Sequence, residues 1–309
     1  MSAFISGMRG AFLYLSRQQN VRRFMETSPQ AQGLTSRFIA GLHLEDGLRV
    51  AKELQARGVM TSLDHLGENV RTEAEAVAAK RQYLAALDRI AAAALSATVS
   101  MKVTSLGLDV SEELCRANTD ELMSRAQSTG SRVECDMEDS GYTDRTLALV
   151  HEMHSKYAST RAVIQAYLYR SEADIEELNR RGIPVRLCKG AYREPAAVAW
   201  PDKVDVDRNY VKLMNAVLER GSYPAIATHD EAIVGQCFEF VRTRGIGPER
   251  FEFQMLYGVR RKLQQQIVAR GFRLRLYVPY GDAWYPYFMR RLAERPANVL
   301  FLARSLTGD

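Results

Sequence analysis

The sequence has no apolar run long enough to span a bilayer, and its N-terminus, with a short apolar run at residues 11–15, lacks the cleavage pattern of a secretory signal peptide. Cysteine is also scarce: the four cysteines among 309 residues form no CxxC pair and no spacing typical of a zinc site. This pattern favours free thiols in a reducing compartment. We therefore expect a cytoplasmic protein, either soluble or peripheral on the inner face of the cell membrane.

Two further absences and a balanced charge exclude classes of ligand. No GxGxxG motif follows any predicted strand, which counts against a doubly wound sheet with a dinucleotide site. His151 and His154 lie three residues apart without a further ligand cluster, so we expect no metal site. The 42 basic and 37 acidic residues alternate along most of the chain, and the net charge of +5 argues against nucleic acid as a partner.

Short apolar runs and helical periods alternate from residue 58 onward. The predicted strands lie near residues 58–64, 97–103, 131–137, 162–167, 183–189, 223–228, 251–256 and 273–278. No Gly/Ser linker or low-complexity tract interrupts this series of eight β/α units, so we predict a single α/β domain that closes into a parallel (βα)8 TIM barrel over residues 58–309. Residues 1–57 read as an N-terminal helical arm packing on the barrel, with helical patterns at 9–26 and 44–57.

The alternation within these strands places polar side chains at one mouth of the barrel. Apolar positions alternate with Ser100 and Lys102 in one strand and with Glu134 and Asp136 in the next. Arg186 has no partner near it in the sequence, so we expect a bound anion to supply one. The other strand ends offer Asp64, Gln165, Thr228, His229, Glu252, Gln254, Arg275 and Tyr277. A single polar residue of this kind is typical of a solvated strand end or of an ion pair in the core. Polar residues at the ends of all eight strands together indicate a binding or catalytic site.

Two segments add features suited to an anionic ligand. VRLCKGAYREP at 185–195 is a strand that delivers an arginine, a lysine and a small-residue turn, a combination suited to phosphate. GDAWYPYFMRRLAERP at 281–296 reads as a helix that follows the last strand directly and can lie across the barrel mouth. Its charged face, suited to gripping a carboxylate, is formed by Tyr287, Arg290, Arg291 and Glu294.

These segments resemble the signatures of the proline dehydrogenase family. The match comprises VRLCKGAYREP at 185–195, FEFQMLYGVR at 251–260 and RLYVPYGDAWYPYFMRRLAER at 275–295, with SMKVTSLGLD at 100–109, CDMEDS at 135–140, IQAYLYR at 164–170 and IATHD at 226–230 in the family's order. The resemblance covers about residues 36 to 306. The length is that of the monofunctional bacterial form and leaves no room for the aldehyde dehydrogenase domain of bifunctional relatives.

The resemblance implies a distorted (βα)8 barrel with FAD bound non-covalently over the strand ends and the C-terminal helix over the mouth. By this resemblance the cofactor-binding residues are Met137, Gln165, Arg186, Lys189, Gly190, Ala191, Tyr192, Thr228, His229, Gln254 and Leu256. The implied reaction is the first step of proline degradation to glutamate. A hydride passes from proline C5 to flavin N5, giving Δ1-pyrroline-5-carboxylate, and the electrons pass to a membrane quinone.

The resemblance also assigns the substrate side. Lys102, Arg290 and Arg291 hold the carboxylate of L-proline, and Tyr277 packs on its ring. Asp136 and Arg186 are the implied catalytic residues: Asp136 orients Lys102, and Arg186 stabilises negative charge on the reduced flavin. The remaining assignments are Glu294, which supports the arginines, and Glu68, which pairs with Arg290 as a gate.

Two other functions are compatible with the strand-end residues alone. One is a barrel lyase that uses Lys102 or Lys189 as a Schiff-base amine, and the other is a non-catalytic barrel that binds an anion in a regulatory role. The sequence is compatible with a homo-oligomer but does not indicate the oligomeric state.

Overall fold

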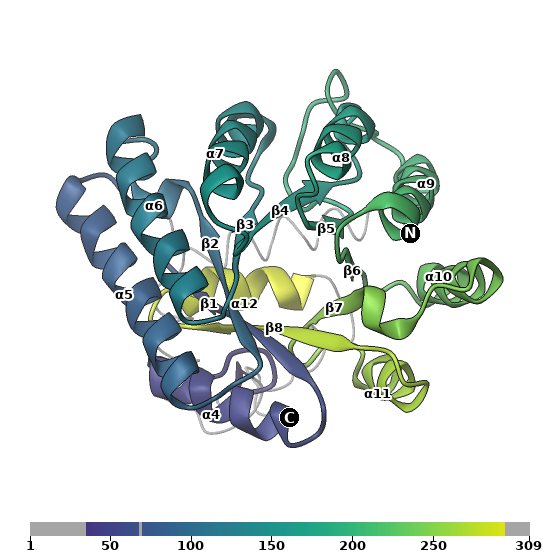
Figure 1. The fold of residues 1–309 in the computed structure, drawn as a ribbon, viewed down its shortest axis with the longest axis horizontal. Helices are drawn as coiled ribbons and strands as arrows, with labels where there is room; N and C mark the ends of the chain where they lie inside the picture. The colour runs from purple at the N-terminus through teal and green to yellow at the C-terminus, as the bar shows by residue number, and fades with distance from the viewer. Residues whose placement is uncertain (1–34, 68–69, 294–309) are drawn as a thin grey trace, which may run out of the picture.

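The computed structural model describes residues 35–67 and 70–293, with side chains as far as Met289. Its eight strands form a closed parallel barrel in the order β1 to β8, and helices surround it (Figure 1). The predicted (βα)8 fold is therefore confirmed. The strands are β1 (Met60–His65), β2 (Ala97–Lys102), β3 (Val133–Asp136), β4 (Thr160–Gln165), β5 (Val185–Cys188), β6 (Ala225–Ala227), β7 (Glu252–Leu256) and β8 (Leu274–Tyr280).

Each strand up to β7 is followed by at least one helix that packs outside the barrel (Figure 1). The described helices are α4 (Leu44–Gln55), α5 (Glu73–Ala92), α6 (Glu112–Ser128), α7 (Thr143–Lys156), α8 (Ser171–Arg180), α9 (Lys203–Arg220), α10 (Glu231–Arg244), α11 (Arg261–Ala269) and α12 (Trp284–Ala293). Among the residues that the structure describes, no helix has both the length and the hydropathy to cross a membrane.

Local sequence explains where several helices begin. Thr72 caps α5, and its hydroxyl accepts a hydrogen bond from the Glu75 backbone while the Glu75 carboxylate binds the Thr72 amide. Ser111 caps α6 in a related way. Asp230 caps α10 by accepting a hydrogen bond from the amide of Ala232. These caps fix the loops that leave the strand ends.

The space between the strands and the helices is apolar. Met101, Leu187 and Phe253 point away from the lumen and are fully buried. Helices contribute residues such as Leu122 and Met214 to the same layer. Burial of a leucine, methionine or phenylalanine side chain contributes about 1.5–3 kcal/mol each, so this layer supplies most of the stability of the fold.

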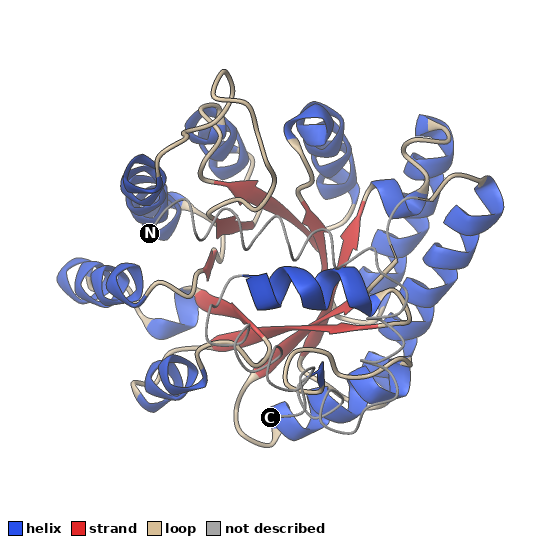
Figure 2. Cartoon of the chain, turned by 180° about the vertical axis from the view of Figure 1, so that it is seen from behind, coloured by secondary structure: helices blue, strands red, loops and turns tan. Residues whose placement is uncertain are grey.

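The two ends of the described chain lie against the barrel. Helix α4, part of the predicted arm, packs against β1 and β8, where Gly47 allows close approach to Tyr280 and Leu63. The predicted helix at 9–26 lies outside the described residues. Helix α12 follows β8 and lies across the opening of the barrel (Figure 2). Its Phe288 ring lies 6.2 Å from the ring of Phe38.

Candidate active site in the barrel

The lumen is filled with charged side chains, in contrast to the branched aliphatic layers that usually fill this fold. The predicted fourth strand at 162–167 begins earlier, at Thr160, and this brings Arg161 into the lumen, which sequence analysis missed. The buried charged residues that pair with one another in the lumen are Glu134, Arg161, Arg186, Glu252 and Arg275. Asp64, another strand-end candidate, is also buried, on β1 beside Ser100 in the sheet register.

Glu252 forms the lower part of this cluster, toward the N-terminal ends of the strands. Its Oε1 accepts hydrogen bonds from Arg161 Nη1 at 2.8 Å, Arg275 Nε at 2.8 Å and Gln254 Nε2 at 2.7 Å. Its Oε2 accepts one from the Tyr223 hydroxyl at 3.1 Å. Burial raises the pKa of Glu252, but Arg275 and Arg161 outweigh it, so the net shift is well below the ordinary value.

Glu134 lies at the centre of the lumen and is fully buried. Its Oε1 accepts hydrogen bonds from Thr98 Oγ1 at 3.0 Å and Arg161 Nη1 at 3.3 Å. Its Oε2 accepts them from Arg186 Nη2 and, at 3.2 Å, from Gln254 Nε2. Burial raises the pKa of Glu134, but the arginines, Arg186 foremost, lower it more, so the carboxylate stays ionised.

Arg186 forms the upper part of the cluster. Its Nη1 donates to Asp136 Oδ1 at 2.5 Å, and its Nη2 donates to Glu134 and to Ser100 Oγ at 3.0 Å. Arg186 has no partner near it in the sequence, as expected, but the expectation that a bound anion supplies its partner is not needed, because Asp136 and Glu134 already pair with it. Its partners are about 50 residues away in the sequence, and closure of the barrel brings them across the lumen from β5. Burial lowers the pKa of Arg186, but the negative charges of Glu134 and Asp136 raise it by more, so the net shift is above the ordinary value.

Asp136 and Tyr277 meet at the top of this cluster. The Tyr277 hydroxyl donates to Asp136 Oδ2 at 2.8 Å, and the Arg186 guanidinium lies 5.3 Å from the centre of the Tyr277 ring. Burial raises the pKa of Asp136, and Arg186 and Lys102 reduce that shift without cancelling it. Lys102 is the direct neighbour of Asp136 in the β2–β3 register and is half-buried. The structure thus brings four of the predicted site residues together.

A second group lies at the end of β5, on the turn that follows it. The amide of Ala191 donates to Gln165 Oε1 at 3.4 Å, and Gln165 Nε2 donates to the Glu138 carbonyl at 2.7 Å. Gly190 has φ +114°, and a Cβ there would lie 2.3 Å from the Tyr167 ring. This turn therefore requires glycine.

Lys189 begins the same turn and pairs with acids from two helices. Its Nζ contacts Asp207 on α9 and lies 2.8 Å from Oδ2 of Asp230, the cap of α10. Burial raises the pKa of Asp230, but the hydrogen bond from Lys189 lowers it more, giving a net downward shift. Because these two carboxylates engage Lys189, the arrangement does not favour it as a free amine for a lyase.

The remaining cofactor candidates lie within β7 or in the segments that follow β3, β5 and β6. His229 Nε2 accepts a hydrogen bond from the amide of Leu256 at 2.8 Å, and Thr228 Oγ1 accepts one from the Asp230 amide at 3.1 Å. Met137 is buried, whereas Tyr192 is exposed. Gln254 points into the lumen, where it donates to Glu134 and Glu252 as described above.

The predicted gate and carboxylate clamp fall largely outside what the structure describes. Glu68 and Glu294 are outside the described residues, and Arg290 and Arg291 are described only by their place in α12. Their assigned roles remain predictions.

Sequence analysis also gave no role to Ser62 and Ser100. Their hydroxyls lie 3.0 Å apart, and both accept from Arg186 Nη2. Alternation had already placed Ser100 on the lumen face, and the same signal could have found Ser62 on the adjacent strand.

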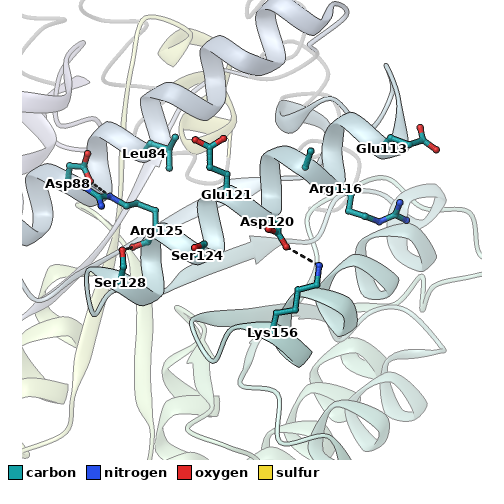
Figure 3. Close-up of a pocket in the computed structure, with 11 residues that line it drawn as sticks. Leu84, Asp88, Glu113, Arg116, Asp120, Glu121, Ser124, Arg125, Ser128 and Lys156 are labelled. Atoms are coloured by element: carbon teal, nitrogen blue, oxygen red, sulfur yellow. Dashed lines mark hydrogen bonds and ion pairs between the residues drawn. The ribbon is translucent and has the colours of Figure 1, made fainter.

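A large hollow also lies outside the barrel, between α5, α6 and α7 (Figure 3). It has a volume of about 920 Å³, and its lining charges pair with one another, as in Arg125 with Asp88 and Lys156 with Asp120 at 2.9 Å. None of the predicted site residues lines it. Within the described ranges, no group of three or more His, Cys, Asp or Glu residues is arranged to hold a metal ion. The barrel mouth therefore remains the candidate site.

Comparisons with known proteins show the family to which this chain is similar. The family model for proline dehydrogenase matches residues 47–304. Proline dehydrogenase 1 of Bacillus subtilis is 38% identical over 299 residues, which are 97% of this chain and 99% of the relative. Proline dehydrogenase of Deinococcus radiodurans is 40% identical over 280 residues, 88% of this chain and 90% of the relative.

A solved structure extends the comparison to the fold. The crystal structure of proline utilization A (PutA) from Bdellovibrio bacteriovorus, inactivated by N-propargylglycine, is 27% identical with a TM-score of 0.80. The match covers 85% of this chain and 33% of that one, so this chain spans about a third of that larger protein. The chain belongs to the proline dehydrogenase family, the flavin-dependent oxidoreductases of proline catabolism.

Proposed function

We propose that this chain oxidises L-proline to Δ1-pyrroline-5-carboxylate with non-covalently bound FAD and passes the electrons to a membrane quinone. When bound, the flavin accepts at N5 the hydride that leaves proline C5. The observation that carries the proposal is the contact of Asp136, Arg186 and Tyr277 at the top of the lumen. These three residues offer a charge, a guanidinium and an aromatic ring beside the turn at residues 189–191.

The residues present fit a flavin in two ways. Arg186 Nε is buried and has no hydrogen-bond partner among the described residues, although Nη1 and Nη2 are both engaged. One donor of this guanidinium thus remains for a ligand. Lys189 places a positive charge beside a turn of small residues, in which Ala191 is exposed, and this combination is suited to phosphate groups. We assign cofactor binding to Met137, Gln165, Arg186, Lys189, Gly190, Ala191, Tyr192, Thr228, His229, Gln254 and Leu256.

The substrate side rests on charge and shape. Lys102, Arg290 and Arg291 bind the carboxylate of proline, and the Tyr277 ring, held by its hydroxyl on Asp136, packs on the pyrrolidine ring. Asp136 balances the charge of Arg186 and orients Lys102, its neighbour in the register. Glu294 supports the two arginines, and Glu68 pairs with Arg290 to restrict solvent access when substrate is bound.

The electron acceptor implies a place for the protein. A quinone is dissolved in the membrane, so the protein works in the cytoplasm and meets the inner face of the cell membrane peripherally. Reoxidation of the proline-reduced protein by vesicles that contain a quinone, compared with vesicles that contain none, tests this part of the proposal.

A visible spectrum before and after anaerobic L-proline tests the central reaction. The purified protein should carry the absorbance of an oxidised flavin, and L-proline should bleach it. L-alanine, which has the amine and the carboxylate without the ring, should leave the absorbance unchanged. A colourless protein that borohydride traps covalently with its substrate would identify a Schiff-base lyase instead.

A further inference from the structure

Glu134 was placed in the lumen by sequence analysis but received no role. It is 0% exposed and reaches both halves of the charged cluster. One oxygen contacts Arg161 of the lower half, and the other contacts Arg186 of the upper half. Among the described residues, the Glu134 carboxylate thus links Arg161 in the lower half of the cluster to Arg186 in the candidate site.

The contacts of Arg186 show how its guanidinium is held. Asp136 binds Nη1, and Glu134 binds Nη2, from positions two residues apart on the lumen face of β3. Ser62 and Ser100 add oxygens to Nη2. Two carboxylates on one strand therefore determine both the tilt and the rotation of the guanidinium plane.

The net charge of the lumen cluster depends on Glu134 as well. Its three guanidinium groups are balanced by three carboxylates, those of Glu134, Asp136 and Glu252. Asp136 is also bound by the Tyr277 hydroxyl and lies half-buried at the mouth, whereas Glu134 is fully enclosed. Water screens Glu134 less, so its charge acts on Arg186 with little attenuation.

We propose that Glu134 is a positioning residue, which fixes the orientation and the effective charge of Arg186 and thereby sets the reduction potential of the flavin. This inference rests on the proposed function. Reduction places negative charge on the flavin ring, and an arginine stabilises that charge according to how much of its own charge is already compensated. Removing the Glu134 charge leaves Arg186 less compensated, so the potential rises.

The experiment compares two isosteric substitutions in the holoenzyme. Glu134→Gln should favour the reduced flavin about tenfold, a rise of about 30 mV for a two-electron couple. Glu252→Gln is the matched control. It removes one charge from the same cluster, but its partners are Arg161, Arg275, Gln254 and Tyr223 rather than Arg186. It should shift the equilibrium less than threefold. Equal shifts in the two variants, or no shift in Glu134→Gln, would overturn the proposal.

A second pair of variants covers the case in which the amide does not fold. Glu134→Asp keeps the cluster neutral but shortens the side chain, so that one carboxylate no longer reaches both Arg161 and Arg186. Reduction of the flavin by L-proline should slow about tenfold, and Glu252→Asp should slow it less than threefold. Wild-type kinetics and potential in Glu134→Asp would also refute the assignment.

The results separate this inference from the function on which it rests. A wild-type protein without flavin, or one whose flavin L-proline does not bleach, defeats both. A wild-type protein that is bleached normally, with Glu134 and Glu252 variants that behave alike, defeats the role of Glu134 alone.

Discussion

The two faces of the barrel strands differ in what they bury. Toward the helices, Leu187 of β5 and Phe253 of β7 are fully buried among apolar side chains. Toward the lumen, the adjacent positions Arg186 and Glu252 are buried among charges. A single step along the strand therefore separates an apolar environment from an ionic one.

The comparison shows which face stabilises the fold and which face carries the candidate site. Burial in the outer layer contributes roughly 25 cal/mol per Å² and depends little on pH or salt. Ions in the lumen must first recover a desolvation penalty of several kcal/mol each, so a buried ion cluster is weak evidence for stability. What the lumen charges do in this structure is hold Arg186 and Asp136 in place through ion pairs.

Adjacent substitutions on β5 give the largest expected difference between the faces. Arg186→Gln leaves Glu134 and Asp136 without their shared partner. The resulting fall in kcat/KM for proline should correspond to a loss of about 2–5 kcal/mol in transition-state stabilisation. Leu187→Ala should instead cost about 2–5 kcal/mol in the free energy of unfolding, with turnover per folded, flavin-loaded molecule near that of wild type. Urea unfolding and steady-state kinetics measure both. Equal loss of turnover in the two variants would contradict the division between faces.

Acid should weaken the contribution of the lumen charges to stability and leave that of the apolar outer layer unchanged. The pKa of Glu252 lies well below its ordinary value of 4.5 in the folded protein, so its stabilisation is present above pH 4.5 and is lost as the pH falls toward the lowered pKa. Glu252→Gln, which breaks a buried pair, should cost about 3–5 kcal/mol at pH 7 and less in acid. Leu187→Ala serves as the control, since its effect on the free energy of unfolding should be the same at pH 7 and in acid. A pH-independent cost for Glu252→Gln would remove the electrostatic explanation.

A smaller effect is expected at the turn beside the lumen. Gly190→Ala places a Cβ against the Tyr167 ring at a φ of +114° and should destabilise the protein by about 1–3 kcal/mol. It should also weaken FAD binding, because the turn at 189–191 moves. Gly182→Ala is the control: it has φ +70° and no atom within 4 Å of the added Cβ, so it should leave FAD affinity unchanged. Titration of the apo-protein with FAD distinguishes the two.

The sequence was sufficient to predict the fold and to place several of the candidate site residues on the lumen face of the strands. Alternation of period two located every strand to within about three residues at each end, because one strand face must pack on helices. The same alternation put Asp136 and Tyr277 in the lumen, where they share a hydrogen bond.

The pairing inside the lumen could not be predicted in the same way. Arg186 meets Glu134 and Asp136 across the barrel from β3, and these strands are not neighbours in the sheet. Alternation indicates a face, but only the diameter and stagger of the closed barrel decide which charges on that face touch. Lys189 likewise pairs with Asp207 on α9, and a helical pattern alone does not indicate toward which strand end such an acid points.

The smallest expected effect concerns that last pair, at the border between the lumen and solvent. Lys189 and Asp207 are each about a quarter exposed, so water and salt screen their interaction, and its loss should change stability by less than about 1 kcal/mol. If Lys189 binds the flavin phosphates, Asp207 competes with them for the same ammonium. Asp207→Asn should then tighten FAD binding two- to fivefold at low salt, the range that such a weak pair allows. The gain should shrink as the salt concentration rises. Asp205→Asn removes a charge from the same helix, but Asp205 pairs with Arg208, so FAD affinity should not change. Weaker FAD binding in Asp207→Asn would mean that Asp207 orients Lys189 for the cofactor rather than competing with it.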